Sequence, residues 1–213
     1  NRARFGGAFG ASIGATVANS TFAFNTSADG GAVAFPHGAT ANYTYNLNLD
    51  STIIASNLTG PAPTHAADLG IDPRVTLNII GDHNLIGAAD AAIVLPPDTL
   101  RDAPQLLPLA WNGGPTQMLA LASGSPAIDA GSNPLALDTD QRGVGYARGV
   151  VPAADIGAYE TQPPADVIFV DGSIPEPRLR LASRRSSHVV WIVPAGALRA
   201  RLFPPRHMPP LAF

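Results

Sequence analysis

The hydrophobic positions of residues 1–87 come in short runs that are separated by Gly, Asn and Thr, and the runs repeat along the chain. Gly6–Phe9 recurs as Gly30–Val33, and Asn19–Phe22 recurs as Asp50–Ile53. No window before residue 100 sustains apolar residues at the i, i+3, i+4 and i+7 spacing of an amphipathic helix. A repeat of about 20–30 residues built from short β-type runs predicts a solenoid with one coil per repeat.

The residue types of the repeats suit such coils. Ala, Val, Ile and Phe fit a narrow interior, and Gly and Asn tolerate the positive φ that corners require. Asn side chains at equivalent corners can stack, each amide bonding the backbone of the next coil. We therefore expect an all-β fold, a right-handed parallel β-helix over residues 1–87, with residues 88–160 adding irregular coils that cap its open end. A β-sandwich or barrel is the alternative.

The repeats also carry a family resemblance. Phe22-x-x-Asn25, which matches Ile54-x-x-Asn57 in the next repeat, is followed by Gly30–Val33. This combination resembles the repeat of polymorphic outer-membrane proteins. The resemblance implies a parallel β-helix of the pectin-lyase-like type.

Residues 78–160 carry a second, longer resemblance. Five short motifs follow one another in order: Asn84–Gly87, Asp102–Leu106 leading to Pro108–Thr116, Ser123–Gly131, Thr139–Gly143 and Ala154–Glu160. Together they resemble the choice-of-anchor Q domain, which stands at the end of many bacterial β-helical surface proteins. The resemblance implies a terminal region of a secreted or surface-attached protein.

The same motifs can be interpreted from their chemistry. Asn112-Gly113-Gly114-Pro115 predicts a turn, with two Gly free to take positive φ and Pro fixing the exit. Met118–Leu121 and Ala127–Ile128 predict short apolar strands, the second ending at Gly131.

Charged residues lie among the small apolar residues of this region: Asp129, Asp140, Arg142, Asp155 and Glu160. Buried charges must be paired, so we expect a structural network in which Arg142 binds Asp129, Asp140 or Asp155 bidentately and ties successive coils together. Asp138 and Asp140 are an alternative pair of Ca²⁺ ligands.

Catalysis has weaker support. Glycosidases need two facing carboxylates, and lyases combine Ca²⁺ with a base. The repeat region offers only Asp29 and Asp50 before Asp68, and its only Arg residues are Arg2 and Arg4. We predict no catalytic residue and no cofactor, although a centre in coils preceding Asn1 stays open, because the chain starts without Met or a signal peptide.

Composition and charge exclude several kinds of chemistry and several classes of partner. The 213 residues include no Cys, which excludes disulfides and thiol catalysis, and no run reaches the roughly 20 apolar residues of a membrane span. Residues 1–172 hold 6 Arg against 15 acidic residues, so we expect no nucleic-acid binding.

Residues 161–213 differ from the rest of the chain in composition and charge. Within residues 161–172, residues 161–165 predict a linker. Asp166–Gly172 resembles a short C-terminal signature of some bacterial surface proteins, which implies a role in sorting or anchoring. Residues 173–213 reverse the charge, with 7 Arg against one Glu, and we expect this Pro- and Arg-rich tail to be mostly disordered. A reading-frame change near Gly172 is one explanation; a basic segment that contacts membrane or anionic polymer is the other.

The function we predict is a non-catalytic, adhesin-like structural protein displayed outside the cell or on the outer membrane. The partner would be a surface polysaccharide or a ligand on another cell. The alternatives are the terminal part of a β-helical polysaccharide lyase or glycosidase, and a polysaccharide-binding module.

Overall fold

The structure is a computed structural model of the chain. It describes residues 2–3, 6–11, 14–28, 32–35, 43–60, 66–72, 74–149, 152–163, 169–170 and 179–180. The chain divides into two compact units, Asn1–Ala165 and Asp166–Phe213. The expectations for residues 173–213 and for the signature Asp166–Gly172 fall almost entirely outside the described residues, which there form only β13 (Phe169–Val170) and β14 (Leu179–Arg180), an antiparallel pair.

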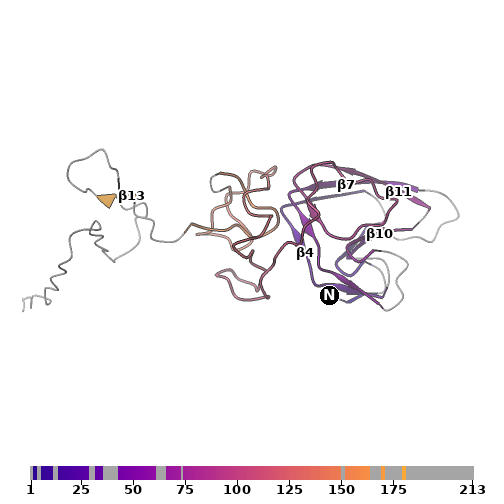
Figure 1. The fold of residues 1–213 in the computed structure, drawn as a ribbon, viewed down its shortest axis with the longest axis horizontal. Coiled ribbons are helices and arrows are strands. Elements are labelled where there is room, and N and C mark those ends of the chain that lie inside the picture. The colour runs from indigo at the N-terminus through magenta and orange to yellow at the C-terminus, as the bar shows by residue number, and fades with distance from the viewer. Residues whose placement is uncertain are drawn as a thin grey trace, which may run out of the picture. The chain divides into compact units, whose positions relative to one another are not determined.

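Three passes of the chain build the first part of unit 1 (Figure 1). The described residues of this part form strands and no helix. The first pass contains β1 (Arg2–Ala3), β2 (Phe9–Gly10), β3 (Ala15–Ala18) and β4 (Thr21–Phe22). The second contains β5 (Thr26–Ser27), β6 (Val33–Phe35), β7 (Tyr43–Asp50) and β8 (Ile53–Ile54). The third contains β9 (Leu58–Thr59), β10 (Leu69–Ile71), β11 (Val75–Ile80) and β12 (Leu85–Ile86).

Each pass contributes one strand to each of four sheets. The sheets are β1-β5-β9, β2-β6-β10, β3-β7-β11 and β4-β8-β12. All their strand pairs are parallel. The predicted all-β character is confirmed for the described residues, and the parallel, stacked repeats are confirmed for those from Arg2 to Ile86.

The register between passes refines the repeat seen in the sequence. Phe9 pairs with Val33, as the recurrence of Gly6–Phe9 in Gly30–Val33 predicts. Thr21 pairs with Ile53, however, so the alignment that placed Phe22 on Ile53 is wrong by one position. The sequence separation between equivalent residues of the first two passes is one residue longer than in that alignment, so Asn19 is equivalent to Ser51. A slip of one position would turn every side chain to the opposite face of its strand, so burial fixes the register.

The corner after the third strand of each pass has a left-handed backbone. Asn19, Ser51 and His83 have φ of 44, 48 and 54°, and they occupy equivalent places in the three passes. A left-handed backbone conformation costs little free energy at Asn and more at Ser. The hydrogen bonds around the corner must therefore hold this conformation. At this corner Asn19 is of the expected type, whereas Ser51 and His83 stand where the sequence argument expected Gly or Asn.

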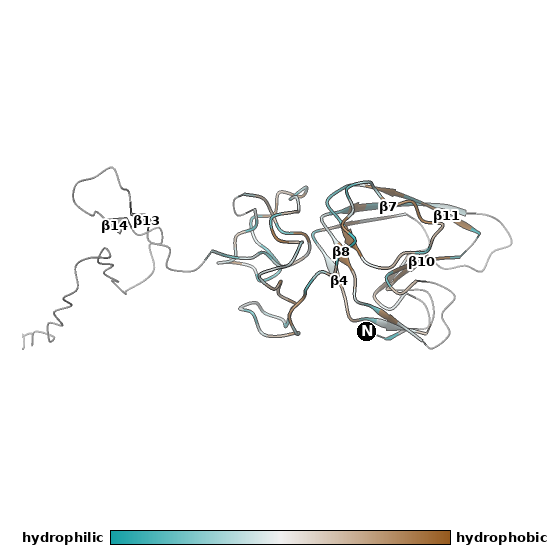
Figure 2. Ribbon diagram, in the orientation of Figure 1, coloured by the Kyte–Doolittle hydropathy of each residue, from teal (hydrophilic) through white to brown (hydrophobic). Residues whose placement is uncertain are grey.

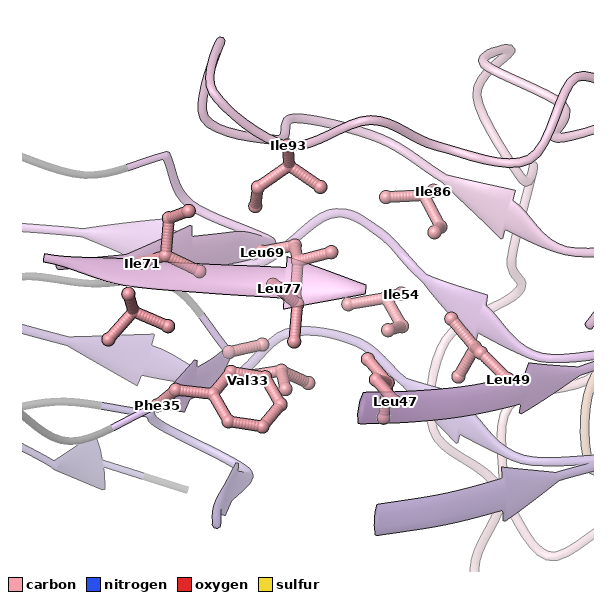
Figure 3. Close-up of a cluster of buried hydrophobic side chains, with 12 residues drawn as sticks. Val33, Phe35, Leu47, Leu49, Ile54, Leu69, Ile71, Leu77, Ile86 and Ile93 are labelled. Atoms are coloured by element: carbon pink, nitrogen blue, oxygen red, sulfur yellow. The ribbon is translucent and has the colours of Figure 1, made fainter. Parts of the chain in front are cut away.

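Apolar side chains fill the space enclosed by the passes (Figure 3). The cluster includes Val33, Phe35, Leu47, Leu49 and Leu69, all at most 2% exposed. Hydrophobic residues are concentrated in short strands such as β8 and β10 (Figure 2). Ile54 and Ile86 belong to this cluster, whereas their neighbours Ile53 and Leu85 belong to a second one. Alternate side chains of β8 and β12 therefore serve two different cores.

Residues 88–160 continue the stack only at their beginning. Ala89 pairs with Leu69 and Leu100 with Leu85 in parallel bridges, and Ile93 enters the first cluster. Beyond residue 101 the described bridges are antiparallel, from Leu106–Leu121 to Thr139–Ala147. Leu121, Ala127 and Ile156 pack on Ile53 and Leu85. Residues 88–100 thus lie on the third pass, and the following residues cover the outer side of β8 and β12.

A buried polar ladder connects the passes. Asn57 Oδ1 accepts hydrogen bonds from the backbone N–H and the Nδ2 of Asn25, both at 3.0 Å. Asp68 Oδ1 in turn accepts from the backbone N–H and Nδ2 of Asn57 at 3.0 and 2.7 Å, and its Oδ2 accepts from the N–H of Ala88 at 2.7 Å. The predicted stacking of corner Asn residues is confirmed for Asn25 and Asn57. Asp68, which completes the ladder, was not expected from the repeat.

The ladder predicts a large effect of Asn57→Ala on stability. The change removes the side-chain acceptor of Asn25 and the Nδ2 donor to Asp68 in a site where all three residues are at most 7% exposed. Each buried group left without a partner costs about 1–3 kcal/mol, so we expect the free energy of unfolding in urea to fall by about 3 kcal/mol.

Asn78→Ala is the matched control. Asn78 Nδ2 also bonds an Asn one pass away, Asn46 Oδ1 at 3.2 Å, but on the exposed face of β11. Its loss should cost no more than about 0.5 kcal/mol. Equal losses for the two variants would contradict the role assigned to the ladder.

Candidate functional site

Four of the five predicted charged residues are buried, namely Asp140, Arg142, Asp155 and Glu160, whereas Asp129 is exposed. Asp140 is 6% exposed. Its two carboxylate oxygens accept bonds from Arg142 Nε at 3.2 and 2.9 Å, and Oδ2 also accepts from Arg142 Nη2 at 2.7 Å. The ring centroids of Tyr146 and Tyr159 lie 3.9 and 4.0 Å from the Arg142 guanidinium carbon. Planar guanidinium groups suit such paired hydrogen bonds and ring stacking.

The Arg142–Asp140 pair closes a local turn. The two residues are two positions apart, and the backbone N–H of Arg142 donates to Asp140 Oδ1 at 2.8 Å. Longer connections run to Glu160, whose carbonyl accepts from Arg142 Nη2 at 2.5 Å and whose N–H donates to Asp140 Oδ2 at 2.8 Å. Arg142 therefore ties residues 140–142 to the end of the region, where the sequence argument expected a tie between coils.

Asp155 organises the second half of the network. It is 1% exposed, and its Oδ1 accepts from the N–H of Asp129 at 2.8 Å. Its Oδ2 accepts from the N–H and the hydroxyl of Thr161 at 2.5 and 2.7 Å. Glu160 Oε2 accepts from the N–H of Asp155 at 3.1 Å. These carboxylates hold backbone in place, and Asp129 takes part through its N–H, with φ of 53°.

Arg148 is a member of the network that the sequence analysis missed. Its side chain is 1% exposed, and its Nη1 lies 3.7 Å from Glu160 Oε2, while Nη2 donates to the carbonyl of Gly157 at 2.8 Å. Burial lowers the pKa of the Arg148 guanidinium, and attraction to Glu160 opposes that shift. Charge balance was the available signal, because Arg142 and Arg148 are the only cations among the five acidic residues of 103–160.

The positions of Asp138 and Asp140 do not support the alternative that these two residues bind Ca²⁺. Asp138 is exposed, and the oxygens of Asp140 are occupied by Arg142. Across the described ranges, no three His, Cys, Asp or Glu side chains gather closely enough to hold a metal ion.

The predicted turn at Asn112-Gly113-Gly114-Pro115 lies between two residues of an antiparallel bridge, Ala110 and Met118. Gly113 has φ of 101°, and Asn112 Nδ2 donates to the carbonyl of Met118 at 3.1 Å. Gly114 has ordinary φ but a tight position, because a Cβ there would lie 2.9 Å from Arg142 Cα. The two Gly residues are therefore required for different reasons.

The network docks on the corners of the first two passes. Ser51 Oγ accepts from the N–H of Ser132 at 3.0 Å, and the Ser51 carbonyl accepts from the N–H of Gly157 at 2.8 Å. Thr21 Oγ1 accepts from the N–H of Ala158 at 3.1 Å. Beside these contacts lies a cleft of about 520 Å³, lined by Asn19, Ser20, Thr21, Phe22, Leu137, Thr139, Asp140, Gln141, Arg148 and Ala158.

Comparison with known proteins identifies no relative: no family model, no curated protein and no solved structure matches the chain. In the part of the chain that the structure describes, no helix is long and apolar enough to cross a membrane.

The network predicts that Arg148 and Glu160 depend on each other. Arg148→Met should remove the cation beside the buried carboxylate of Glu160 and lower the free energy of unfolding by about 3–5 kcal/mol. Adding Glu160→Gln should restore part of that loss, because a neutral amide needs no counter-charge.

The measurement is urea unfolding of the two single variants and the double variant, with exposed Arg101→Met as the control. Strict additivity of Arg148→Met and Glu160→Gln would refute the coupling.

Proposed function

We propose that residues 1–100 form a right-handed parallel β-helix. Three passes that pair strand for strand in four parallel sheets support this fold. Connections between parallel strands of one sheet are almost always right-handed, which supports the handedness. The buried ladder of Asn25, Asn57 and Asp68 supports it further, because stacked side chains at equivalent corners need coils that repeat in register.

We further propose that the chain is a non-catalytic structural segment, adhesin-like, of a secreted or surface-displayed protein. The observation that carries this proposal is that the acidic residues of 140–160 are buried and already hold hydrogen-bond partners within the chain. Asp140, Asp155 and Glu160 are each at most 6% exposed and accept hydrogen bonds from neighbouring backbone or Arg groups. A general acid or base must instead reach a substrate.

The resemblance to the choice-of-anchor Q domain fits this proposal. Its motifs Thr139–Gly143 and Ala154–Glu160 contain the paired charges, and Asn112–Pro115 approaches them at Gly114. The motifs thus coincide with the residues that fix the architecture of 102–160. A terminal domain with few coils has little sheet pairing to stabilise it, so it needs buried ion pairs and hydrogen bonds of this kind.

The enzyme alternative is less well supported. Among the lining residues of the cleft, Asp140 is the one carboxylate, and its oxygens face Arg142 at 2.7–3.2 Å. Glycoside hydrolysis needs a second carboxylate across the bond to be cleaved.

Two measurements test the proposed function. The purified chain, incubated with pectin, alginate, xylan and chitin, should release no reducing ends and no unsaturated sugars above a boiled sample. In cells that produce the full-length protein, an antibody against this region should stain intact cells, and added protease should remove the signal. Cleavage that depends on Asp140, or staining that needs permeabilised cells, would overturn the proposal.

A further inference from the structure

We propose that the cleft beside the β3–β4 corner binds a neutral, hydroxyl-rich ligand, such as one or two sugar units of a neutral glycan. Its walls come from Asn19–Phe22 on one side and from Leu137, Thr139–Gln141, Arg148 and Ala158 on the other. The volume of about 520 Å³ lies within the usual range of small-molecule sites. This inference goes beyond the proposed structural role and does not depend on it.

Two buried polar atoms of the cleft residues carry the proposal. Asn19 is 7% exposed and donates its Nδ2 to the carbonyl of Ser132 at 2.8 Å, but its Oδ1 has no partner. Arg148 is also 7% exposed, and its Nε has no partner although both Nη atoms are engaged. Folded proteins seldom leave buried polar atoms unpaired. Of the four such atoms in the described chain, two belong to residues of this one cleft.

The two atoms define the chemistry of the ligand. Asn19 Oδ1 needs a donor, and Arg148 Nε–H needs an acceptor. A hydroxyl group provides both functions, so a ligand with several hydroxyls satisfies the two atoms together. Thr139, Gln141 and Ser20 add further polar groups along the walls.

The charges of the cleft favour a neutral ligand. Asp140 is paired with Arg142, and Arg148 lies 3.7 Å from Glu160. An anion would meet a guanidinium that is already compensated, and a cation would meet a carboxylate that is already occupied. The cleft therefore lacks the free charge that acidic sugars or phosphates need.

Phe22 and Leu137 give the cleft an apolar side. Phe22 is half-buried and stacks on Phe9 with ring centroids 6.5 Å apart, so its ring is held in place. Leu137 is 39% exposed at the rim. Asn19 Oδ1 and Arg148 Nε are buried, so a ligand reaches them only after side chains of the cleft change rotamer. Exposed lining side chains such as Leu137 and Gln141 do so within nanoseconds. An apolar wall beside hydroxyl-binding groups matches the two-sided character of a pyranose ring.

The chain provides a matched pair of variants for the test. Asn19→Gly removes the unpaired amide oxygen while keeping the left-handed φ of 44° accessible. His83→Gly makes the same backbone change at the equivalent corner two passes away, where the residue is exposed and does not line the cleft. Thr139→Val removes a hydroxyl from the wall at almost constant volume.

The experiment measures binding of the full chain to glucose, galactose, mannose, N-acetylglucosamine, cellobiose and lactose, with galacturonic acid as the charged comparison. Saturation-transfer NMR detects binding, and calorimetry gives Kd. We expect at least one neutral sugar to bind, with Kd raised about ten-fold by Asn19→Gly and by Thr139→Val, as for the loss of one or two hydrogen bonds, and unchanged by His83→Gly.

Several results would overturn the inference. They are binding of no neutral sugar, preference for galacturonic acid, or neutral-sugar binding that Asn19→Gly and Thr139→Val leave unchanged. Urea unfolding of each variant identifies loss of fold, and Thr139→Val tests the cleft even where Asn19→Gly unfolds. A negative result leaves the staining and degradation tests of the structural role unaffected, so the two proposals fail separately.

Discussion

The structure depends on the parallel backbone hydrogen bonds that place each pass of the chain in register on the one before it. Once Thr21, Ile53 and Leu85 are aligned, every residue near them lies on the residue at the equivalent position of the neighbouring pass. The second ladder, in which Ser20 N–H donates to Thr52 Oγ1 and Thr52 N–H to Asn84 Oδ1, follows from the same spacing. In the two ladders the side chains of Thr52, Asn57 and Asn84 accept from the backbone of the preceding pass, which allows these polar residues to be buried beside a small apolar core.

The same register explains why residues 102–160 lie beside the passes. Ile53 and Leu85 are 0% exposed although their neighbours Ile54 and Ile86 already face the first cluster. Strands with apolar side chains on both faces need a covering on each side. Residues 106–156 supply it with Leu121, Ala127 and Ile156. Because this segment has few strands of its own, its backbone is held by Asp140, Asp155 and Glu160 instead of by sheet pairing.

The sequence allowed the regular part of the fold to be predicted and the irregular part only by its residue types. Periodicity and turn residues indicated β-structure with parallel repeats, and Asn25 and Asn57 could be placed on one ladder from their spacing. The register of Asn19–Phe22 was misjudged by one position, because similar side chains such as Asn19 and Asp50 align well in letters while the pleat decides which of them faces inward.

The partners of Asp68 and Arg148 could not be predicted, since both residues reach them through irregular loops. Asp68 completes the ladder from a position 11 residues after Asn57, where no repeat places it. Arg148 meets Glu160 across a loop that follows no period. In such regions the composition says that charges must pair, and only the folded chain decides which residues do so.

Arg148 joins the architecture to the cleft. Its Nη groups donate to the carbonyls of Gly157 and Asp155, its Nε has no partner, and Arg148 is one of the residues that line the cleft. Asn19 occupies the corresponding position on the other side, because its amide fastens Ser132 to the β3–β4 corner and leaves Oδ1 unpaired. Asn19, which docks Ser132 on the stacked passes, and Arg148, which holds Asp155 and Gly157 in place, therefore also carry the unpaired atoms. A ligand bound there would contact both parts at once, so its binding would also strengthen the docking between them.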